Sequence, residues 1–206
     1  MFIFTAFIHA LCSVPALPAD SHLQALTGGR PSLEVPFFEY QIQTGLSYGE
    51  VYVGGHGGRI EGVIVVFGPG QDFARSECSD GTHSEPSNAY VAKLPSEMQQ
   101  WWQLHIRPKY AELMQVSLGG VDARRSLWHI RLLAVHPKHQ RNGVGRGLMD
   151  GIMRKANAGR QRMCLEVYND RLVRHFTRLG FRVKGTKNFS SYQGGFPLFC
   201  MVREPC

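Results

Sequence analysis

The sequence has few cysteines, and neither they nor the histidines are spaced as metal ligands. The five cysteines are odd in number and form no C-x-x-C pair, which argues against a disulfide framework or a zinc site and indicates a reducing compartment. The nine histidines include no H-E-x-x-H or comparable spacing. The ATP-binding pattern G-x-x-x-x-G-K-[ST] is also absent. We therefore expect no bound metal and a cytoplasmic protein.

Long hydrophobic runs are missing as well. The first 19 residues, MFIFTAFIHALCSVPALPA, are apolar but interrupted by proline, and they are too short for a convincing membrane span. Val14-Pro15-Ala16 resembles a signal-peptide cleavage site, yet no Lys or Arg occurs before Arg30, so the basic region of such a peptide is missing. Secretion is therefore the weaker alternative. We expect no membrane association and an apolar segment of uncertain role at residues 1–21.

Acidic residues are scarce in one part of the chain. Residues 123–188 hold 16 Lys and Arg but 3 Asp and Glu, whereas the rest of the chain holds 7 and 13. Such a concentration of positive charge indicates a phosphate-bearing ligand or a nucleic acid. The basic residues are dispersed along predicted helices and a strand, without the interleaved aromatics of a nucleic-acid surface, so we expect no nucleic acid partner.

The most informative stretch is residues 132–148, LLAVHPKHQRNGVGRGL. Residues 132–135 are a short apolar run that predicts a buried strand, and Pro137 ends it. Gly143 and Gly145 then precede a predicted helix. A helix start offers unpaired N–H groups and a positive dipole end, and glycine allows close approach, so this loop is expected to bind a phosphate. The glycine spacing does not fit the dinucleotide pattern G-x-G-x-x-G.

Several linked motifs resemble the GNAT superfamily of N-acetyltransferases. The pattern Q-R-x-G-x-G at 140–145, after a strand ending L-A-V-x-P, is similar to the motif with which that family binds acetyl-coenzyme A. Residues 163–167 (MCLEV) resemble its next strand, and residues 176–181 (FTRLGF) resemble its Y-x-x-L-G-F signature. The pattern G-V-x-x-x-x-x-P-G at 62–70 is similar to that of fungal members.

The resemblance implies an α/β fold of the GNAT type, a mixed and mostly antiparallel sheet whose parallel central strands splay apart between flanking helices. It implies one N-acetyltransferase (GNAT) domain over residues 22–206, with the cofactor half at 127–185, which suits a chain of 206 residues that is 43% hydrophobic. The implied reaction moves an acetyl group from acetyl-CoA to a primary amine of a small molecule or peptide. We expect a monomer or a homodimer.

The resemblance also assigns an acetyl-CoA site. Backbone groups of Leu133 and Val135 would bond the pantetheine arm, and the N–H near Val135 would polarise the acetyl carbonyl. Asn169 would bond the coenzyme arm, with a helix N-cap as the competing role. Phe176, also expected at the cofactor, occupies the position where the family usually has a tyrosine. The residues expected to hold the pyrophosphate are Gln140, Arg141, Asn142, Gly143, Val144, Gly145 and Arg146.

Proton transfer has three candidate residues. Glu166, on the strand beside the expected cleft, is the best-placed base, and His129 is an alternative that titrates near neutral pH. For either residue a structural polar role is the competing interpretation. Phe176 has no proton for the leaving thiolate, so Tyr168, Tyr192 or solvent would supply it. The missing acid keeps open a second function, a non-catalytic acyl-CoA-binding or regulatory module.

Periodicity and turn residues predict the remaining elements. These are a helix from a Ser32 cap to about Gly45, a hairpin of strands at 50–53 and 60–67, a polar loop at 71–89, a helical region at 95–118 interrupted at Pro108, a strand at 126–135, a helix at 143–158, a strand at 163–167, a helix at 169–179, a strand after Phe181 and a last strand at 197–203. The pattern G-x-S-x-G at 45–49 is that of a hydrolase nucleophile elbow, but that motif needs a strand before the serine and a helix after it. The predicted order is the reverse, so we expect an ordinary turn.

Three further patterns concern side chains. Strict alternation would place Leu127, His129, Arg131, Leu133 and Val135 on one face of the central strand, whereas the resemblance implies a bulge in this strand. Gly147 and Gly151 would permit close approach of a neighbour to the following helix. A group of aromatic residues would either shape the pocket for a partly apolar amine or belong to the core. These residues are Trp101, Trp102, His105 and Tyr110.

Overall fold

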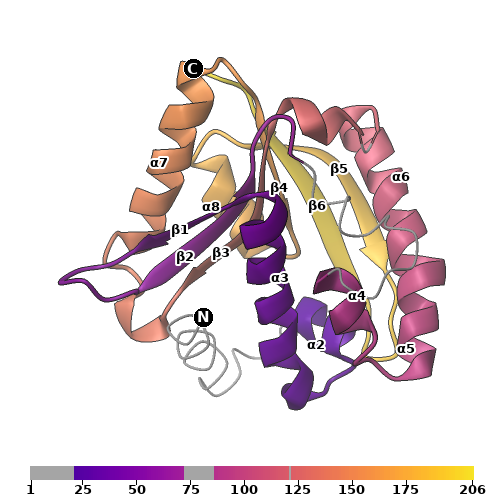
Figure 1. Cartoon of the computed structure of the whole chain (residues 1–206). Helices are drawn as coiled ribbons and strands as arrows, with labels where there is room; N and C mark the ends of the chain where they lie inside the picture. The colour runs from indigo at the N-terminus through magenta and orange to yellow at the C-terminus, as the bar shows by residue number, and fades with distance from the viewer. Residues whose placement is uncertain (1–20, 72–85, 121) are drawn as a thin grey trace.

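A six-stranded sheet with helices on both faces forms the protein, as seen in a computed structural model that describes residues 21–71, 86–120 and 122–206 (Figure 1). The strand order is β1-β2-β3-β4-β6-β5, and neighbouring strands are antiparallel except for the parallel pair β3 and β4. The strands are β1 (Glu50–Gly54), β2 (Gly62–Phe67), β3 (Trp128–Val135), β4 (Met163–Val167), β5 (Arg182–Phe189) and β6 (Phe196–Arg203). This mixed arrangement confirms the predicted fold class.

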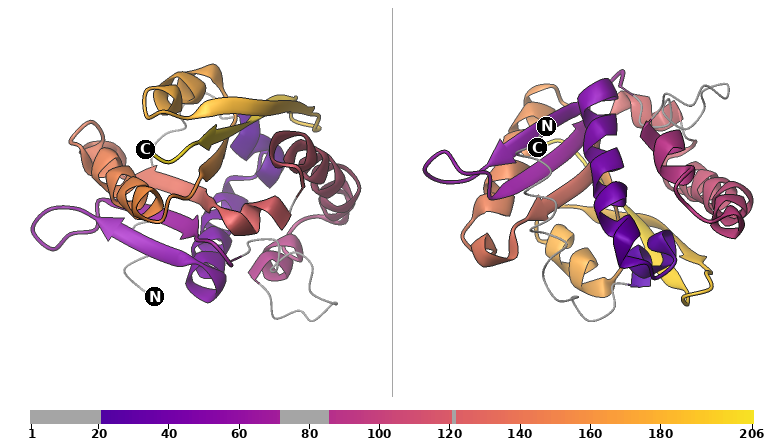
Figure 2. Two further views of the ribbon diagram at one scale, coloured as in Figure 1. Left: turned by 90° about the horizontal axis from the view of Figure 1, so that it is seen from above. Right: turned by 60° about the horizontal axis from the view of Figure 1, so that its bottom comes forward.

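The helices form two groups, one on each face of the sheet. One group is α7 (Val144–Ala158) and α8 (Asp170–Thr177). The other is α2 (Ser21–Thr27), α3 (Glu34–Tyr48), α4 (Pro86–Val91), α5 (Ser96–Trp101) and α6 (Arg107–Leu118). Figure 2 shows α7 and α6 at opposite sides of the molecule. Within the described part of the chain, no helix combines the length and the apolarity that a membrane crossing requires.

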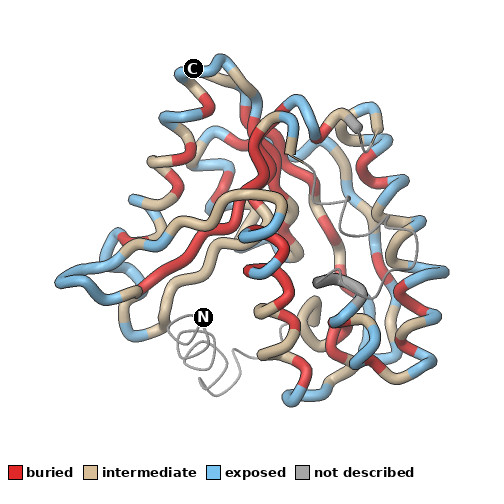
Figure 3. The backbone as a smooth tube through the Cα atoms, in the orientation of Figure 1, coloured by how far each residue is buried: buried red, intermediate tan, exposed pale blue. Residues whose placement is uncertain are grey.

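Each face of the sheet has its own buried core. In β2, Ile64 packs with Met149 of α7 in one core, whereas Val65 and Phe67 pack with residues of the other helix group. Every residue of β2 is buried, which explains its uninterrupted apolar run. The buried residues follow the central strands and the inner sides of the helices (Figure 3). The predicted hairpin of β1 and β2 is confirmed by their antiparallel register.

The central strand β3 contains a bulge at Arg131. Ile130 and Leu132 pair with consecutive residues of β2, so Arg131 has no partner in that ladder. The bulge makes the predicted strict alternation wrong. Arg131 reaches Gln41 of α3, whereas Leu133 packs on the opposite face, in the core with α7. The extra residue therefore shifts the alternation by one position, so that odd-numbered residues after the bulge lie on the face that even-numbered residues occupy before it.

The two parallel strands pair over a short distance and then separate, as predicted. Their last pair is Ile130 with Leu165. Beyond it β3 continues to Val135 along β2, while β4 continues to Val167 along β6. A gap therefore opens between the two strands in the middle of the sheet.

The start of α3 differs from the prediction. Residues Pro31–Leu33 form a 3-10 turn, and Leu33 rather than Ser32 precedes the helix, with no side-chain cap. The helix continues to Tyr48, so most of the G-x-S-x-G segment is helical and not a turn. Since a helix precedes the serine and β1 follows, the segment has the reverse of the nucleophile-elbow order.

The helical region before β3 is continuous, and the predicted break at Pro108 is wrong. A π-helix, Trp102–Ile106, joins α5 directly to α6. The Arg107 N–H donates across this wider turn to the carbonyl of Trp102. Pro108 lies in the first turn of α6, where its missing N–H costs little.

Other predictions were partly wrong or lie outside the described residues. Residues 86–89 of the predicted polar loop belong to helix α4. The rest of that loop, like residues 1–20, lies almost wholly outside the described part of the chain. An added Cβ at Gly147 or Gly151 would meet nothing within 4 Å, so the described residues show no close neighbour at either glycine.

Candidate active site

The loop between β3 and α7 leaves the start of the helix open. Arg141 and Gly143 have positive φ angles of 65° and 83°, and the glycine adopts its angle without the steric cost that Arg141 bears. Gly143 is the N-cap of α7, and no side chain caps the helix. An added Cβ there would meet nothing within 4 Å. The first N–H groups of α7 therefore face open space, a geometry that fits a diphosphate.

The same loop packs closely on the end of β3. Gln140 Nε2 donates to the Val135 carbonyl at 3.2 Å. An added Cβ at Gly145 would lie 3.2 Å from Val135 Cγ2, so a larger residue would crowd this contact. Arg146 points along the outside of the helix, where its Nε donates to both carboxylate oxygens of Asp150 at 2.8 and 3.0 Å. Backbone groups, more than the Arg146 charge, thus define the site at this loop.

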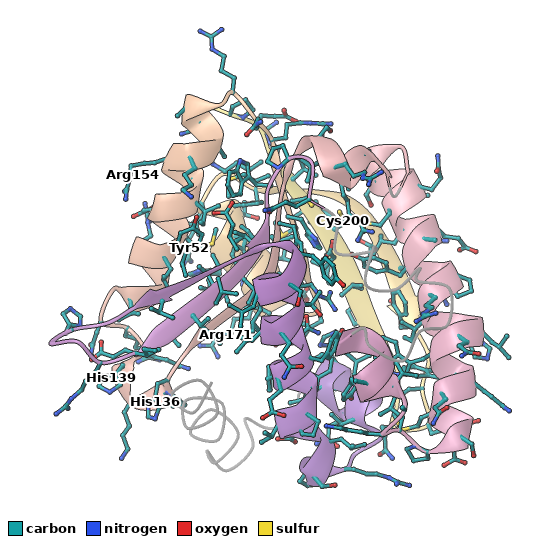
Figure 4. All side chains as sticks on the ribbon, viewed as in Figure 1. Tyr52, His136, His139, Arg154, Arg171 and Cys200 are labelled. Carbon is teal, nitrogen blue, oxygen red and sulfur yellow. The ribbon has the colours of Figure 1, made fainter. Side chains whose placement is uncertain are left out.

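A buried carboxylate anchors the loop from the other side. Glu61, 6% exposed, contacts Nδ1 of His56 at 2.8 Å and Nδ1 of His139 at 3.3 Å. The hydrogen bond with His56 lowers the pKa of Glu61. Figure 4 shows His136 and His139 on the loop that precedes α7. Sequence reasoning missed Glu61, because its only signal is an acidic residue directly before an apolar strand.

A cavity of about 790 Å³ adjoins the gap between β3 and β4. Val135 and Gln140 line it near the loop, and Phe176 of α8 lines it nearby. Glu166 of β4 also lines it, as does Phe37 of α3 on the opposite helix group. The cavity therefore extends from the Gln140 end of the loop to a chamber under α3 and α6, and residues 141–146 of the predicted pyrophosphate site are not part of its lining.

The fold joins two of the predicted catalytic residues into a buried pair. His129 Nε2 lies 2.8 Å from Glu166 Oε2, and the two side chains are 2% and 6% exposed. Burial alone would raise the pKa of Glu166, but the neighbouring His129, Arg131 and Arg124 lower it to about 2. Glu166 is therefore ionised at neutral pH, and its oxygen accepts the hydrogen bond from the ring nitrogen of His129.

Glu166 also has an unused acceptor. Its Oε1 atom is buried and has no hydrogen-bond partner among the described residues. Burial, together with the Glu166 charge, raises the pKa of nearby Tyr110 well above its usual range. The Tyr110 hydroxyl accepts a hydrogen bond from Arg124 Nη1 at 3.0 Å. The leftover carboxylate oxygen makes Glu166 suited to bind a positively charged or N–H-bearing group.

Cys164 lies beside this pair. One ligand atom each of His129, Cys164 and Glu166 lies within 4.8 Å of the others. Sequence spacing gave no sign of this group, because it depends on the pairing of β3 with β4. Burial and the charge of Glu166 raise the pKa of the Cys164 thiol well above its usual range, and a protonated thiol is a poor metal ligand.

The two tyrosines considered as the leaving-group acid differ in their position relative to the cavity. Tyr168 lines the cavity, and its ring stacks on His22 with centroids 4.5 Å apart. Tyr192 is 81% exposed and is not part of the cavity lining. Phe176 is buried and packs edge-on against Phe181 at 5.8 Å. Of the two tyrosines considered from sequence, Tyr168 alone is at the cavity.

Asn169 has the competing role foreseen for it. Its Oδ1 accepts a hydrogen bond from the Leu172 N–H at 2.9 Å, which caps α8. Its side chain is therefore already engaged at the helix start.

The aromatic residues before β3 divide between pocket and core. Trp102 and Tyr110 line the cavity. Trp101 belongs to the core, and its Nε1 donates to the Ser190 carbonyl at 2.9 Å. His105 is exposed. Trp102 and Tyr110 therefore shape the pocket while also packing on the core, whereas Trp101 belongs to the core and lies outside the cavity lining.

Two residues of α3 that sequence reasoning missed hold the bulged arginine. Arg131 Nε donates to Gln41 Oε1 at 2.7 Å, and its Nη2 donates to the Tyr40 hydroxyl at 3.1 Å. Gln41 is 3% exposed. A glutamine on the buried side of an apolar helix was the available signal, since such a group needs a partner.

The separation of the parallel strands β3 and β4, next to the loop that leads into α7, is the feature of the sheet that indicates its fold class. Residues 101–183 match the protein-family model described as acetyltransferase (GNAT) domain. The arrangement of strands and helices is the GNAT fold, shared with solved acetyltransferase structures at low sequence identity. No curated protein sequence matches the chain.

Three solved structures illustrate the likeness. The polyamine N-acetyltransferase of Drosophila melanogaster has a TM-score of 0.56 and 17% identity, over 97% of this chain and 96% of its own. An agmatine N-acetyltransferase variant has a TM-score of 0.52 and 18% identity, over 88% and 86%. A Corynebacterium glutamicum protein described as histone acetyltransferase HPA2 and related acetyltransferase has a TM-score of 0.51 and 19% identity, over 100% and 90%. At these identities the likeness defines the fold alone.

Proposed function

We propose that the protein is an N-acetyltransferase that moves an acetyl group from acetyl-CoA to a primary amine. One observation carries the proposal, namely the gap between β3 and β4 beside a cavity that both Gln140, on the loop before α7, and Glu166 line. Names of similar structures that refer to polyamine and agmatine acetylation support an amine as acceptor. The Gly62–Gly70 pattern favours a fungal-type member, and the domain is proposed to span residues 22–206.

The coenzyme would be held mainly by the backbone. The uncapped N–H groups of Val144 and Gly145, after Gly143, would bind the pyrophosphate. Leu133 and Val135, on the β3 edge freed by the gap, would offer backbone groups to the pantetheine arm. When bound, the coenzyme supplies an acetyl thioester, whose carbonyl an N–H near Val135 would polarise.

Glu166 would prepare the amine. Because it is ionised at neutral pH, it attracts an ammonium group to its free Oε1 oxygen. A carboxylate with so low a pKa is a weak base, so Glu166 would hold the ammonium group by its charge, and the proton would pass from the amine to water in the open cavity. His129 is a positioning residue, which fixes the carboxylate through its hydrogen bond to Oε2.

Tyr168 would protonate the leaving thiolate. It lines the cavity, and Phe176 at the usual tyrosine position has no proton to give. Thiolates are good leaving groups, so this step contributes less to the rate than the preparation of the amine.

Thiol release with a panel of primary amines tests the proposal, with binding of coenzyme A measured separately by calorimetry. We expect binding of coenzyme A together with amine-dependent thiol release. Absence of coenzyme A binding would overturn the proposal. The second candidate, a non-catalytic acyl-CoA-binding module, is favoured by Phe176. Binding of coenzyme A without thiol release from any amine would establish it in place of the enzyme.

A further inference from the structure

The wall of the cavity next to α6 carries hydrogen-bond donors that no described residue uses. Arg107 lines the cavity and is partly exposed, and its side chain makes no hydrogen bond or ion pair with any described residue. Trp102 lines the cavity too and is 6% exposed, and its buried Nε1 has no partner in the described part of the chain. Because the Arg107 N–H bonds to the Trp102 carbonyl, the two residues lie one π-turn apart on the same side of the helix.

The other arginines at the site have partners. Arg131 is held by Gln41 and Tyr40 of α3. Arg124 donates to the Tyr110 hydroxyl. Arg131 and Arg124 also lie near enough to the Glu166 charge to lower the pKa of that carboxyl, whereas Arg107 is not among the groups that do so. A half-buried cation of this kind favours an anionic group.

The position of Arg107 relative to Glu166 sets the spacing of a ligand. Glu166, Tyr110 and Arg107 line the same cavity. On α6, Arg107 lies three residues before Tyr110, a displacement of about 5 Å along the helix axis. A molecule whose amine reaches Glu166 can therefore extend along the cavity wall and place a second group at Arg107. Apolar lining residues surround this path, including Phe37, Ile106 and Leu198.

We infer that the acceptor is a primary amine that also bears a carboxylate several bonds away on an apolar or aromatic body, and that Arg107 binds this carboxylate. The inference rests on the proposed function and names the substrate class of the same site. A guanidinium pairs with a carboxylate through two parallel hydrogen bonds, which a lysine cannot reproduce. A diamine would place its second cation against Arg107. Glu34 of α3 also lines the cavity and has an interaction of its own.

Three acceptors that differ in one substituent test the inference: 4-(aminomethyl)benzoate, benzylamine and 1,4-bis(aminomethyl)benzene. We expect kcat/KM for the carboxylate to exceed that for benzylamine by about tenfold or more, since a charged hydrogen-bonded pair is gained. The diamine should be the poorest of the three. In Arg107→Gln the ratio of kcat/KM for the carboxylate to that for benzylamine should fall to about one, mainly through a higher KM for the carboxylate. Arg107→Lys should restore part of the preference.

Arg154→Gln is the matched control, because this exposed arginine of α7 points away from the sheet (Figure 4). It should retain the full preference. Preference for the diamine, or a carboxylate preference that survives Arg107→Gln, would overturn the inference while leaving the acetyltransferase function intact. If no amine is acetylated, the proposed function fails. Calorimetry with 4-(aminomethyl)benzoate and benzylamine then still decides whether Arg107 selects a carboxylate.

Discussion

At the residue scale, Glu166 combines a low pKa with a position at the cavity. We expect Glu166→Gln to lower kcat/KM about a hundredfold or more, because the ammonium group loses the buried carboxylate that pairs with it. The amide is isosteric, so the His129 contact can persist and the fold should survive. Steady-state thiol release and circular dichroism together check this result. A variant with full activity would show that Glu166 is only a structural partner of His129.

The same carboxylate makes a prediction about acid stability. Its pKa is about 2 in the folded protein against 4.5 as the usual value. A lowered pKa means that the ionised form stabilises the fold, fully above pH 4.5, and that this contribution is lost as the pH falls toward 2. Melting temperatures of the wild type should therefore fall more steeply over this range than those of Glu166→Gln. Parallel melting curves for the two proteins would contradict the lowered pKa.

Tyr168 and Phe176 make a second pair of residue-scale predictions. Tyr168→Phe should lower kcat by about tenfold. General acid catalysis contributes more than this when the leaving group is poor, but a thiolate is a good leaving group and needs less help. Phe176→Tyr, which adds a phenol beside the cavity, should raise kcat or rescue Tyr168→Phe. The measurement is kcat at saturating acetyl-CoA. If Tyr168→Phe is unaffected, solvent is the proton donor.

At the scale of elements, glycines in and before α7 have opposite requirements. Gly143 has a φ of 83°, so Gly143→Ala should cost about 1–2 kcal/mol from the left-handed backbone and weaken coenzyme A binding. Gly151 is helical, and an added Cβ meets nothing within 4 Å. Gly151→Ala should therefore stabilise the protein by about 0.5–1 kcal/mol without changing affinity. Chemical denaturation and calorimetry measure both effects. Equal effects at both positions would contradict this backbone assignment.

The elements were predictable wherever a local pattern decides the structure. The apolar run before Pro137, followed by Gly143, predicts a strand, a loop and a helix because each step depends on neighbouring residues. The family resemblance implies a bulge in this strand, but its position at Arg131 was not predictable, because apolar residues flank Arg131 and strict alternation fits them equally well. The π-turn before Pro108 was not predicted either, because a proline in a helical pattern normally indicates a break in the helix.

The site was predictable in part, for the same physical reason. The loop residues are adjacent in sequence, and their open geometry follows from glycine. The contact between His129 and Glu166 joins residues 37 positions apart and depends on the register of the two parallel strands. Arg107 was not foreseen either, because its place on the cavity wall depends on the wide turn of the π-helix.

At the scale of the whole molecule, the uneven charge and the cavity predict how ligands change stability. Coenzyme A at a hundred times its Kd should stabilise the fold by about 2.7 kcal/mol, which for a chain of this length raises Tm by roughly 5–10 °C. Because residues 123–188 carry the excess of basic residues, the affinity should weaken as salt rises. Thermal melts at low and high ionic strength check both effects. A salt-independent affinity would place the phosphates away from the basic half.

The unpaired residue of β3 has a consequence for deletions in this strand. Removing Arg131 would restore a regular ladder, because Ile130 and Leu132 already pair with consecutive residues of β2. Leu132 would stay in the core under α3 and Leu133 in the core under α7. The shortened strand should therefore fold, whereas deleting a paired residue such as Leu133 would move the residues after it to the other face of the sheet.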